Sequence, residues 1–142
     1  MERLTSNKIS TADMSTFELV YNCCYTDNAR NARYRDYKLD IDTRELIKNL
    51  IDDMCGEDLS TLSNEEFDEY MSEMMLSADM DSSMGIIALL YRNMCAMADL
   101  RERLKYYEDL EEQGRLFELQ NTAHSNKTTR TRIKYFRKGA IQ

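Results

Sequence analysis

The feature that most constrains this chain is its shortage of residues that interrupt helices. It has 142 residues, no proline and only four glycines. Proline and glycine are the residues that break or weaken helices most strongly, so long helical segments can form between the glycines. Hydrophobic residues (42%) and charged residues (32%) are balanced as in globular proteins rather than disordered ones. The sequence therefore predicts an all-α fold in one domain.

Helix start signals occur at four places in the chain. Two of them are capping boxes, in which a Ser is followed three residues later by Glu, and each side chain caps the other residue's backbone N–H. Each signal precedes apolar residues at helical spacing, such as Phe17, Val20, Tyr21 and Cys24 on one face of the first helix. The four predicted helices begin after Ser15, Asp42 and Ser63, and near Ser82 or Ser83.

Composition divides the chain into three segments. Residues 1–14 are expected to be a flexible leader, residues 15–119 a single helical domain, and residues 120–142 a basic tail. The last helix can run to Gln113, with Gly114 as its C-cap. The predicted architecture is a compact bundle of about four helices with a long central C-terminal helix and flexible ends.

Targeting signals are not visible in the sequence. The first ten residues, MERLTSNKIS, lack the apolar region of a signal peptide, and the longest apolar run, MGIIALLY, is too short to cross a bilayer. We therefore expect a cytoplasmic protein without a membrane partner. Its four cysteines are expected to be reduced thiols in that compartment.

Charge is distributed unevenly along the chain. Residues 40–81 contain 14 Asp or Glu and only two basic residues, Arg44 and Lys48, whereas residues 122–142 contain six basic residues and no acidic one. In the third predicted helix, Phe67, Tyr70, Met71, Met74 and Met75 are expected to face inward, and Glu65, Glu69 and Glu73 outward. Like charges at this spacing cost a helix about 0.2–0.5 kcal/mol per pair.

Two interpretations of these carboxylates remain open. They are either the solvated surface of a small helical protein or a surface that imitates the phosphates of a nucleic acid and docks in a basic groove of another protein. Methionines beside the charges would add adaptable apolar contacts. The predicted partner-binding residues, named the acidic face from here on, are Glu65, Glu66, Glu69, Glu73, Asp79 and Asp81.

Basic residues mixed with tyrosines suggest a different partner. On a helix, Arg30, Arg33, Tyr34 and Tyr37 would share one face and could clamp a nucleic acid strand, and the basic tail could contact phosphates. The alternative is that these cations pair with the nearby acidic helices. The candidate nucleic-acid-binding residues are Arg30, Arg33, Tyr34, Arg35, Tyr37, Lys38, Arg130, Arg132, Lys134, Arg137 and Lys138.

Catalytic and metal-binding patterns are weak. The only histidine, His124, lies in the tail, and the sequence has neither G-x-S-x-G nor a Gly-rich phosphate loop. The segment DMDSSMG resembles the start of a calcium loop, but its glycine comes one residue late and Leu90 occupies the position of the bidentate glutamate. We therefore predict no enzymatic activity, no cofactor and no metal.

Apolar residues at successive spacings of seven, three, four and three mark the last predicted helix. They are Leu90, Met97, Leu100, Leu104 and Tyr107, which would form a short coiled-coil-like seam. A homodimeric structural or interaction protein that uses this seam is a further hypothesis for the function of the chain.

Two short segments carry a resemblance to known proteins. MERLT at residues 1–5 and LRERLKYYEDLEEQG at residues 100–114 resemble small uncharacterised proteins of bacteriophages and integrated elements in Gram-positive bacteria. Those proteins often begin M-x-R-L-T and carry a later L-x-x-Y-E-D, matched here by Leu104, Tyr107, Glu108 and Asp109. The match covers about twenty residues and lacks the proline-containing stretch that usually follows Y-E-D.

The resemblance implies an accessory gene of a mobile element. Such genes include small acidic inhibitors of host defence, among them anti-CRISPR proteins that occupy the nucleic-acid channel of a CRISPR effector. We therefore expect a non-enzymatic inhibitor that binds a host nucleic-acid-binding protein, with a CRISPR effector nuclease as the preferred partner. The alternatives are a nucleic-acid-binding accessory protein and the homodimer.

Overall fold

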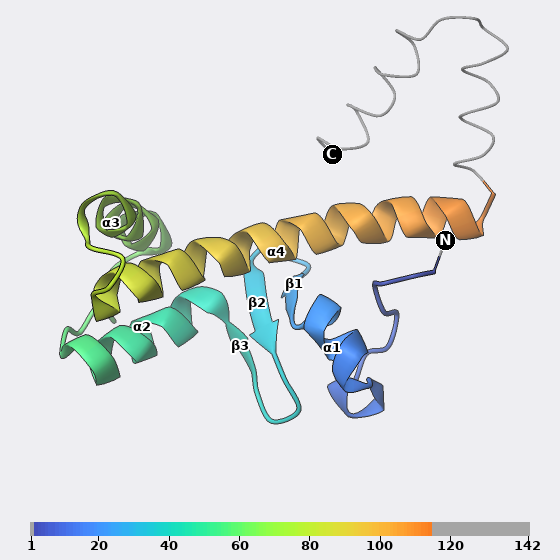
Figure 1. Ribbon diagram of the computed structural model, residues 1–142, viewed down its shortest axis with the longest axis horizontal. Helices are drawn as coiled ribbons and strands as arrows, with labels where there is room; N and C mark the ends of the chain where they lie inside the picture. Colours follow the sequence, from blue (N-terminus) through green and yellow to red (C-terminus); the bar gives the residue numbers. More distant parts are fainter. Residues whose placement is uncertain (1, 115–142) are drawn as a thin grey trace, which may run out of the picture.

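A three-stranded antiparallel sheet lies against one long helix in the computed structural model, which describes residues 2–114 (Figure 1). The sheet and a short helix lie on one side of the long helix, and two further helices pack near its N-terminal end. In chain order the elements are the 3₁₀ turn η1 (Thr11–Asp13), α1 (Thr16–Asn22), β1 (Cys24–Thr26), β2 (Ala32–Arg35), β3 (Asp40–Asp42), α2 (Thr43–Cys55), α3 (Asn64–Ser77) and α4 (Ser83–Glu112).

The sheet shows that the all-α prediction is wrong, and the fold is mixed α and β. Cys24 pairs with Tyr34 across β1 and β2, and Tyr34 pairs with Ile41 across β2 and β3. Both hairpin turns form without proline or glycine. The Asp27 carboxylate accepts hydrogen bonds from the backbone N–H groups of Ala29 and Asn31. These bonds stabilise the turn in the absence of glycine and proline.

The second hairpin turn uses the same chemistry. The Asp36 carboxylate accepts hydrogen bonds from the backbone N–H groups of Lys38 and Leu39, each at 2.8 Å. In the first turn, Arg30 adopts a left-handed conformation with φ of 64°. A shortage of proline and glycine therefore did not exclude strands, because aspartate side chains and one strained residue close the turns.

The four predicted helices and their N-caps are confirmed, but only Ser63 of the predicted Ser63–Glu66 capping box acts as a cap, and the C-cap of α4 is Gln113 rather than Gly114. Ser15 and Glu18 form a complete capping box at α1, and the Asp42, Ser63 and Ser82 side chains cap α2, α3 and α4. Gly56 ends α2 in the left-handed conformation, with φ of 68°. Helix α4 extends over 30 residues, and Gly114 follows it with φ of 74°.

The hydrophobic core lies where α2, α3 and the N-terminal half of α4 meet the sheet. Ile47 and Ile51 of α2 and Phe67 and Met71 of α3 are fully buried. The Phe67 ring meets the Tyr91 ring edge-on, with 5.3 Å between their centroids. Each such large apolar side chain contributes about 1.5–3 kcal/mol when it is buried, so this region is the main source of stability.

The predicted inward face of the first helix is wrong. Phe17 is 82% exposed, and Val20 and Tyr21 are also exposed, whereas Cys24 is buried as part of β1. Helix α1 has only seven residues, and its buried residue is the polar Asn22. Polar contacts, rather than an apolar stripe, hold this helix to the rest of the fold.

The N-terminal segment, predicted to be a flexible leader, contacts the C-terminal half of α4. Thr5 and Met14 are buried, and the Arg3 guanidinium lies 2.7 Å from the Asp109 carboxylate. The contacts are made by polar side chains, which have no periodicity that a sequence pattern would reveal. Residues 115–119 of the predicted domain and residues 120–142 of the predicted tail lie outside the described residues.

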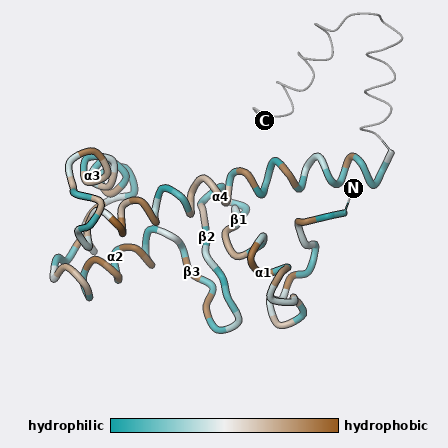
Figure 2. Tube along the Cα trace, viewed as in Figure 1, coloured by the Kyte–Doolittle hydropathy of each residue, from teal (hydrophilic) through white to brown (hydrophobic). Residues whose placement is uncertain are grey.

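Helix α4 organises the whole arrangement. Figure 2 shows hydrophobic positions concentrated in its N-terminal half, which packs against α2 and α3, and mostly hydrophilic positions in its C-terminal half. Helix α3 is seen nearly end-on in Figure 1, so its axis crosses that of α4. Within residues 2–114, no helix has both the length and the hydropathy that crossing a bilayer requires.

Candidate protein-interaction surface

The acidic face lies on α3 and on the connection between α3 and α4. Its six members, Glu65, Glu66, Glu69, Glu73, Asp79 and Asp81, are all exposed. None of their carboxylates makes a hydrogen bond or an ion pair with another side chain among residues 2–114. The predicted outward orientation of Glu65, Glu69 and Glu73 is thus confirmed, whereas their role in binding stays a prediction.

The two cations of residues 40–81 are both turned inward. The Arg44 guanidinium makes a double contact with Asp68, with Nε 3.0 Å from Oδ1 and Nη2 2.8 Å from Oδ2. The Lys48 ammonium donates to the Leu62 carbonyl at 3.0 Å and lies 5.4 Å from the centre of the Phe67 ring. Neither cation is therefore available to neutralise the acidic face.

Further carboxylates extend the negative charge to the end of α2. Asp52, Asp53, Glu57 and Asp58 are exposed there. The Tyr70 hydroxyl of α3 donates to the Glu57 carboxylate at 2.8 Å and so ties the two regions together. Burial and this carboxylate together raise the pKa of Tyr70 to about 12, which keeps the hydroxyl protonated as a donor. One end of the molecule is consequently strongly anionic.

Apolar side chains accompany the acidic face. Leu76 is 89% exposed, and Met75 and Met80 are also exposed. Met71 and Phe67 are buried as predicted, whereas the predicted inward orientation of Met75 is wrong. Leu76 was not among the predicted residues, because it follows a run of inward positions and no pattern marks it as exposed. The surface therefore combines fixed negative charge with adaptable apolar contacts.

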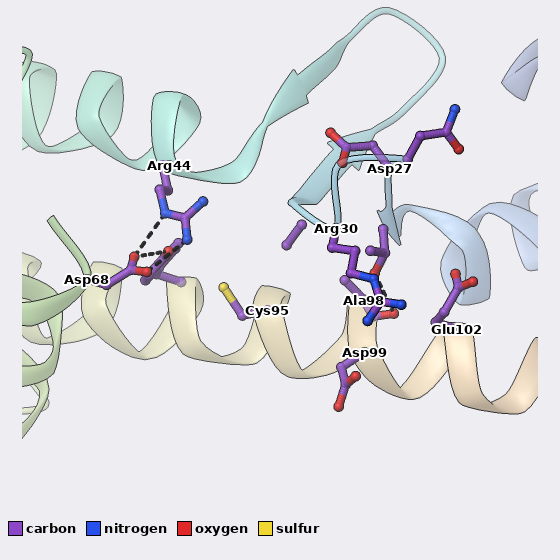
Figure 3. Close-up of a pocket in the computed structure, with 12 residues that line it drawn as sticks. Asp27, Arg30, Arg44, Asp68, Cys95, Ala98, Asp99 and Glu102 are labelled. Atoms are coloured by element: carbon purple, nitrogen blue, oxygen red, sulfur yellow. Dashed lines mark hydrogen bonds and ion pairs between the residues drawn. The ribbon is translucent and has the colours of Figure 1, made fainter. Parts of the chain in front are cut away.

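A polar cavity of about 550 Å³ lies between the β1–β2 turn and α4. Figure 3 shows the Arg44–Asp68 pair at one end of it, Cys95 near the middle, and Arg30 with Asp99 and Glu102 at the other end. Arg44 comes from α2 and Asp68 from α3, whereas the other end is formed by the turn and by α4.

Hydrogen bonding fixes the protonation states at the Arg44 end of the cavity. Burial disfavours the Asp68 carboxylate, but hydrogen bonds from Arg44 and from the Tyr91 hydroxyl, the latter at 2.5 Å, outweigh it and hold the pKa of Asp68 below its usual value. Burial raises the pKa of Tyr91 and that of the Cys95 thiol. The cavity therefore holds an ion pair and two protonated side chains at neutral pH, without an activated nucleophile.

The structure does not place the basic and aromatic residues on one helical face, so that prediction is wrong. Most of them lie in the hairpins and make internal contacts. The Arg33 guanidinium lies 3.1 Å from the Asp40 carboxylate, and the Tyr34 hydroxyl donates to Asp36 at 3.1 Å. The alternation of a strand directs neighbouring residues to opposite faces, which separates Arg33 from Tyr34.

The remaining members of this cluster are divided between the interior and the surface. Arg35 is buried, donates from Nε to the Asn22 carbonyl at 3.0 Å, and lies over the Tyr25 ring. Tyr37 donates its hydroxyl to the Met14 carbonyl. Arg30 and Lys38 are exposed. The tail candidates Arg130, Arg132, Lys134, Arg137 and Lys138 lie outside the described residues.

Sequence reasoning missed a buried polar network beneath α1. Asn22 is fully buried, and its side-chain oxygen accepts hydrogen bonds from Arg101 Nε at 2.9 Å and from the Ser6 N–H at 2.8 Å. Burial lowers the pKa of Arg101. Neither residue stands in a pattern that would reveal it, because both look like ordinary surface positions of helices.

No family model, curated protein or solved structure matches this chain. The resemblance to phage and mobile-element proteins therefore stays a prediction. Among the described residues, no group of three or more His, Cys, Asp or Glu side chains is placed to hold a metal ion.

Proposed function

We propose that this chain is a non-enzymatic binding protein whose acidic face occupies a basic, nucleic-acid-binding groove of another protein in the cytoplasm of a host cell. The observation that supports this function is the set of six exposed carboxylates that have no side-chain partner among residues 2–114, beside two cations that are turned inward. The resemblance to mobile-element proteins favours a host defence protein as the partner, and a CRISPR effector nuclease within that class.

The spacing of charge on α3 supports imitation of a phosphate backbone. Glu65, Glu66, Glu69 and Glu73 fall within about 100° around the helix and within about 12 Å along its axis, from 1.5 Å of rise per residue. This is about one charge per 4 Å, close to the axial spacing of about 3.4 Å between phosphates on one DNA strand. A groove built for phosphates can therefore pair with these carboxylates.

Electrostatic repulsion within the acidic face also favours the binding of a cationic partner. Like-charge pairs at i, i+4 spacing weaken α3 by a few tenths of a kcal/mol each. A cationic partner would remove this repulsion and speed encounter through electrostatic steering. Exposed Leu76 and Met80 beside the charges would add apolar contact that a purely solvated surface does not need.

Charge reversal tests this proposal. The chain is immobilised and exposed to lysate of a Gram-positive host, and captured nucleic-acid-binding proteins are identified and quantified. Glu65→Lys, Glu69→Lys and Glu73→Lys together should reduce capture about tenfold or more, because each contact would become repulsive. The matched control changes Glu2, Asp13 and Glu102 to Lys, which alters net charge equally at exposed sites away from α3 and should leave capture intact.

The outcome of the capture experiment is decisive once the fold is verified. Both triple variants should keep the helical circular dichroism of the parent chain, since all six positions are exposed. Equal capture by the parent and by the acidic-face variant would contradict the proposal. Equal loss in the acidic-face variant and the control would show that only net charge matters, which also contradicts it.

Direct nucleic-acid binding is distinguished by a separate measurement. Arg33 and Arg35 are engaged inside the fold, so the hairpins offer only Arg30 and Lys38 as exposed cations among the proposed residues 30–38. Fluorescence anisotropy of labelled single-stranded DNA and RNA should show no binding by the free chain. Binding that weakens steeply with salt would favour the nucleic-acid-binding alternative instead.

A further inference from the structure

A second apolar surface runs along α4 on a side that the core does not use. Ile86 is 54% exposed, Leu90 and Met97 are each 42% exposed, and Leu100 is 58% exposed. With Asn93 and the half-buried Leu104 they recur at alternating spacings of four and three residues. This is the spacing of residues that pack between two helices in a coiled coil. We name residues 86, 90, 93, 97, 100 and 104 the α4 stripe.

The position of the stripe leaves it open to a partner. The buried residues Ile87, Tyr91, Met94 and Ala98 belong to the hydrophobic core, and helix geometry places the stripe about a quarter to a third of a turn away from them. In Figure 1 the side of α4 away from the sheet is not covered by another described element beyond the crossing with α3. Exposed apolar residues that adjoin one another on a surface form the kind of patch that marks interaction sites in soluble proteins.

We propose that residues 93, 97, 100 and 104 of the α4 stripe pack against the same four residues of a second copy of this chain, with the two helices antiparallel and the contact centred on Met97 and Leu100. Met97 of one copy then packs against Leu100 of the other, twice about the two-fold axis. The heptad-like spacing is self-complementary, so the same surface serves both copies. This interface does not depend on the partner proposed for the acidic face.

The distribution of charge along the molecule favours the antiparallel arrangement of the two α4 helices. Parallel helices would bring together the two anionic ends, each of which carries the acidic face and the carboxylates at the end of α2. In the antiparallel pair centred on Met97 and Leu100, Gly114 of one copy lies level with Ser83 of the other, next to its Asp79 and Asp81.

The composition of the chain after Gly114 makes this alignment favourable. Residues 115–142 contain seven Lys or Arg and one Glu. Within one copy this basic segment starts at the end of α4 that is remote from the acidic face, about 45 Å away by helix rise. In the antiparallel pair it starts beside the acidic end of the other copy, where opposite charges attract.

Sedimentation velocity of the full chain tests the association. The parent chain should sediment as a dimer, and Leu100→Glu should make it a monomer. The control Phe17→Glu introduces the same charge at another highly exposed apolar residue, on α1, and should stay dimeric. Met97→Lys provides a second interface variant with the opposite charge. Monomeric sedimentation of the parent over a hundredfold concentration range, or dimers of both interface variants, would overturn the proposal.

Photocrosslinking tests the direction of the helices. Benzoylphenylalanine in place of Asn93 should crosslink to the segment around Leu104 of the other copy, as identified by mass spectrometry of the joined peptides. Crosslinks to the segment around Asn93 itself would demonstrate a parallel pair, and crosslinks to the α1 surface would demonstrate a different interface. Either result would overturn the antiparallel arrangement.

Discussion

Thr5 and Glu108 lie 103 residues apart in the sequence and are joined by two hydrogen bonds, from the Thr5 N–H at 2.9 Å and from its hydroxyl at 2.6 Å to the same carboxylate oxygen. The Leu4 N–H donates to the other oxygen at 2.6 Å. The N-terminal segment and the C-terminal half of α4 therefore contact each other, and the Glu108 carboxylate holds the N-terminal segment on α4.

Removing the negative charge of Glu108 should destabilise the protein. Glu108→Gln keeps the size of the side chain but replaces one acceptor oxygen by an amide that cannot accept from the backbone donors. Loss of hydrogen bonds to a buried charged group costs about 1–3 kcal/mol in the free energy of unfolding. Urea titration followed by circular dichroism measures this change. Glu102→Gln, at an exposed position of the same helix, should be neutral, and an equal effect of both variants would refute the role of Glu108.

Acid should release the same contact. Burial opposes ionisation of Glu108, but hydrogen bonds from Thr5 and from the Leu4 N–H hold the pKa of this carboxyl below its ordinary value of 4.5. A carboxyl whose pKa is lower in the folded state contributes stability above pH 4.5, and that stability is lost as the pH falls through the lower folded value.

Stability measured by urea titration should therefore fall below about pH 4.5 in the parent chain. Asp68 and Asp109, whose pKa values are also lowered, add to this loss. Glu108→Gln should show a shallower decline, because it lacks one of the titrating groups. An identical pH profile for the variant and the parent would show that Glu108 is not linked to folding.

The hydroxyl of Tyr91 should be coupled to the ion pair of Asp68. Tyr91→Phe keeps the edge-on contact with Phe67 but removes the donor to the Asp68 carboxylate. We expect a loss of about 1.5–3 kcal/mol, as for a hydrogen bond to a charged group. A double-mutant cycle with Asp68→Asn measures the interaction, and additive effects of the two changes would contradict a direct coupling.

Gly85 should tolerate a side chain poorly, although it lies in the first turn of a helix. A Cβ atom there would come 2.1 Å from the Asp79 carbonyl oxygen, which is a backbone atom. Gly85→Ala should therefore shift the α3–α4 connection and cost about 1–3 kcal/mol, as overpacking does. Gly56→Ala, where the space is open but φ is 68°, should cost only about 1–2 kcal/mol. Thermal unfolding in which Gly85→Ala is more stable than the parent would refute the clash.

The sequence was informative wherever one side chain determines a local structure. Ser15, Asp42 and Ser63 marked the helix starts because a capping oxygen acts within three residues of its own position. The hairpins were missed because Asp27 and Asp36, rather than glycine, close them, and aspartates were abundant throughout the segment. The buried Asn22 and Arg101 depend on contacts between distant segments, which no local pattern reports.

The acidic face was visible in the sequence because its carboxylates follow helical spacing opposite Phe67 and Met71. The inward orientation of Arg44 and Lys48 was not visible, since a lysine or arginine in an acidic region can equally pair with surface carboxylates. Four members of the α4 stripe, Leu90, Met97, Leu100 and Leu104, were predicted as part of a seam with Tyr107, whereas Ile86 and Asn93 were not, and the exposure of the stripe depends on which side of α4 the sheet occupies. The hairpins form this sheet, and the sequence did not reveal them.

Displacement of nucleic acid from a captured partner tests the central claim most directly. Labelled nucleic acid is bound to the purified partner, and its fluorescence anisotropy is followed as this chain is added. The account predicts stoichiometric release by the parent chain and by the Glu2, Asp13 and Glu102 control, and no release by the variant with Lys at positions 65, 69 and 73. Release by that variant equal to release by the parent, or binding of the chain while the nucleic acid stays in place, would contradict the account.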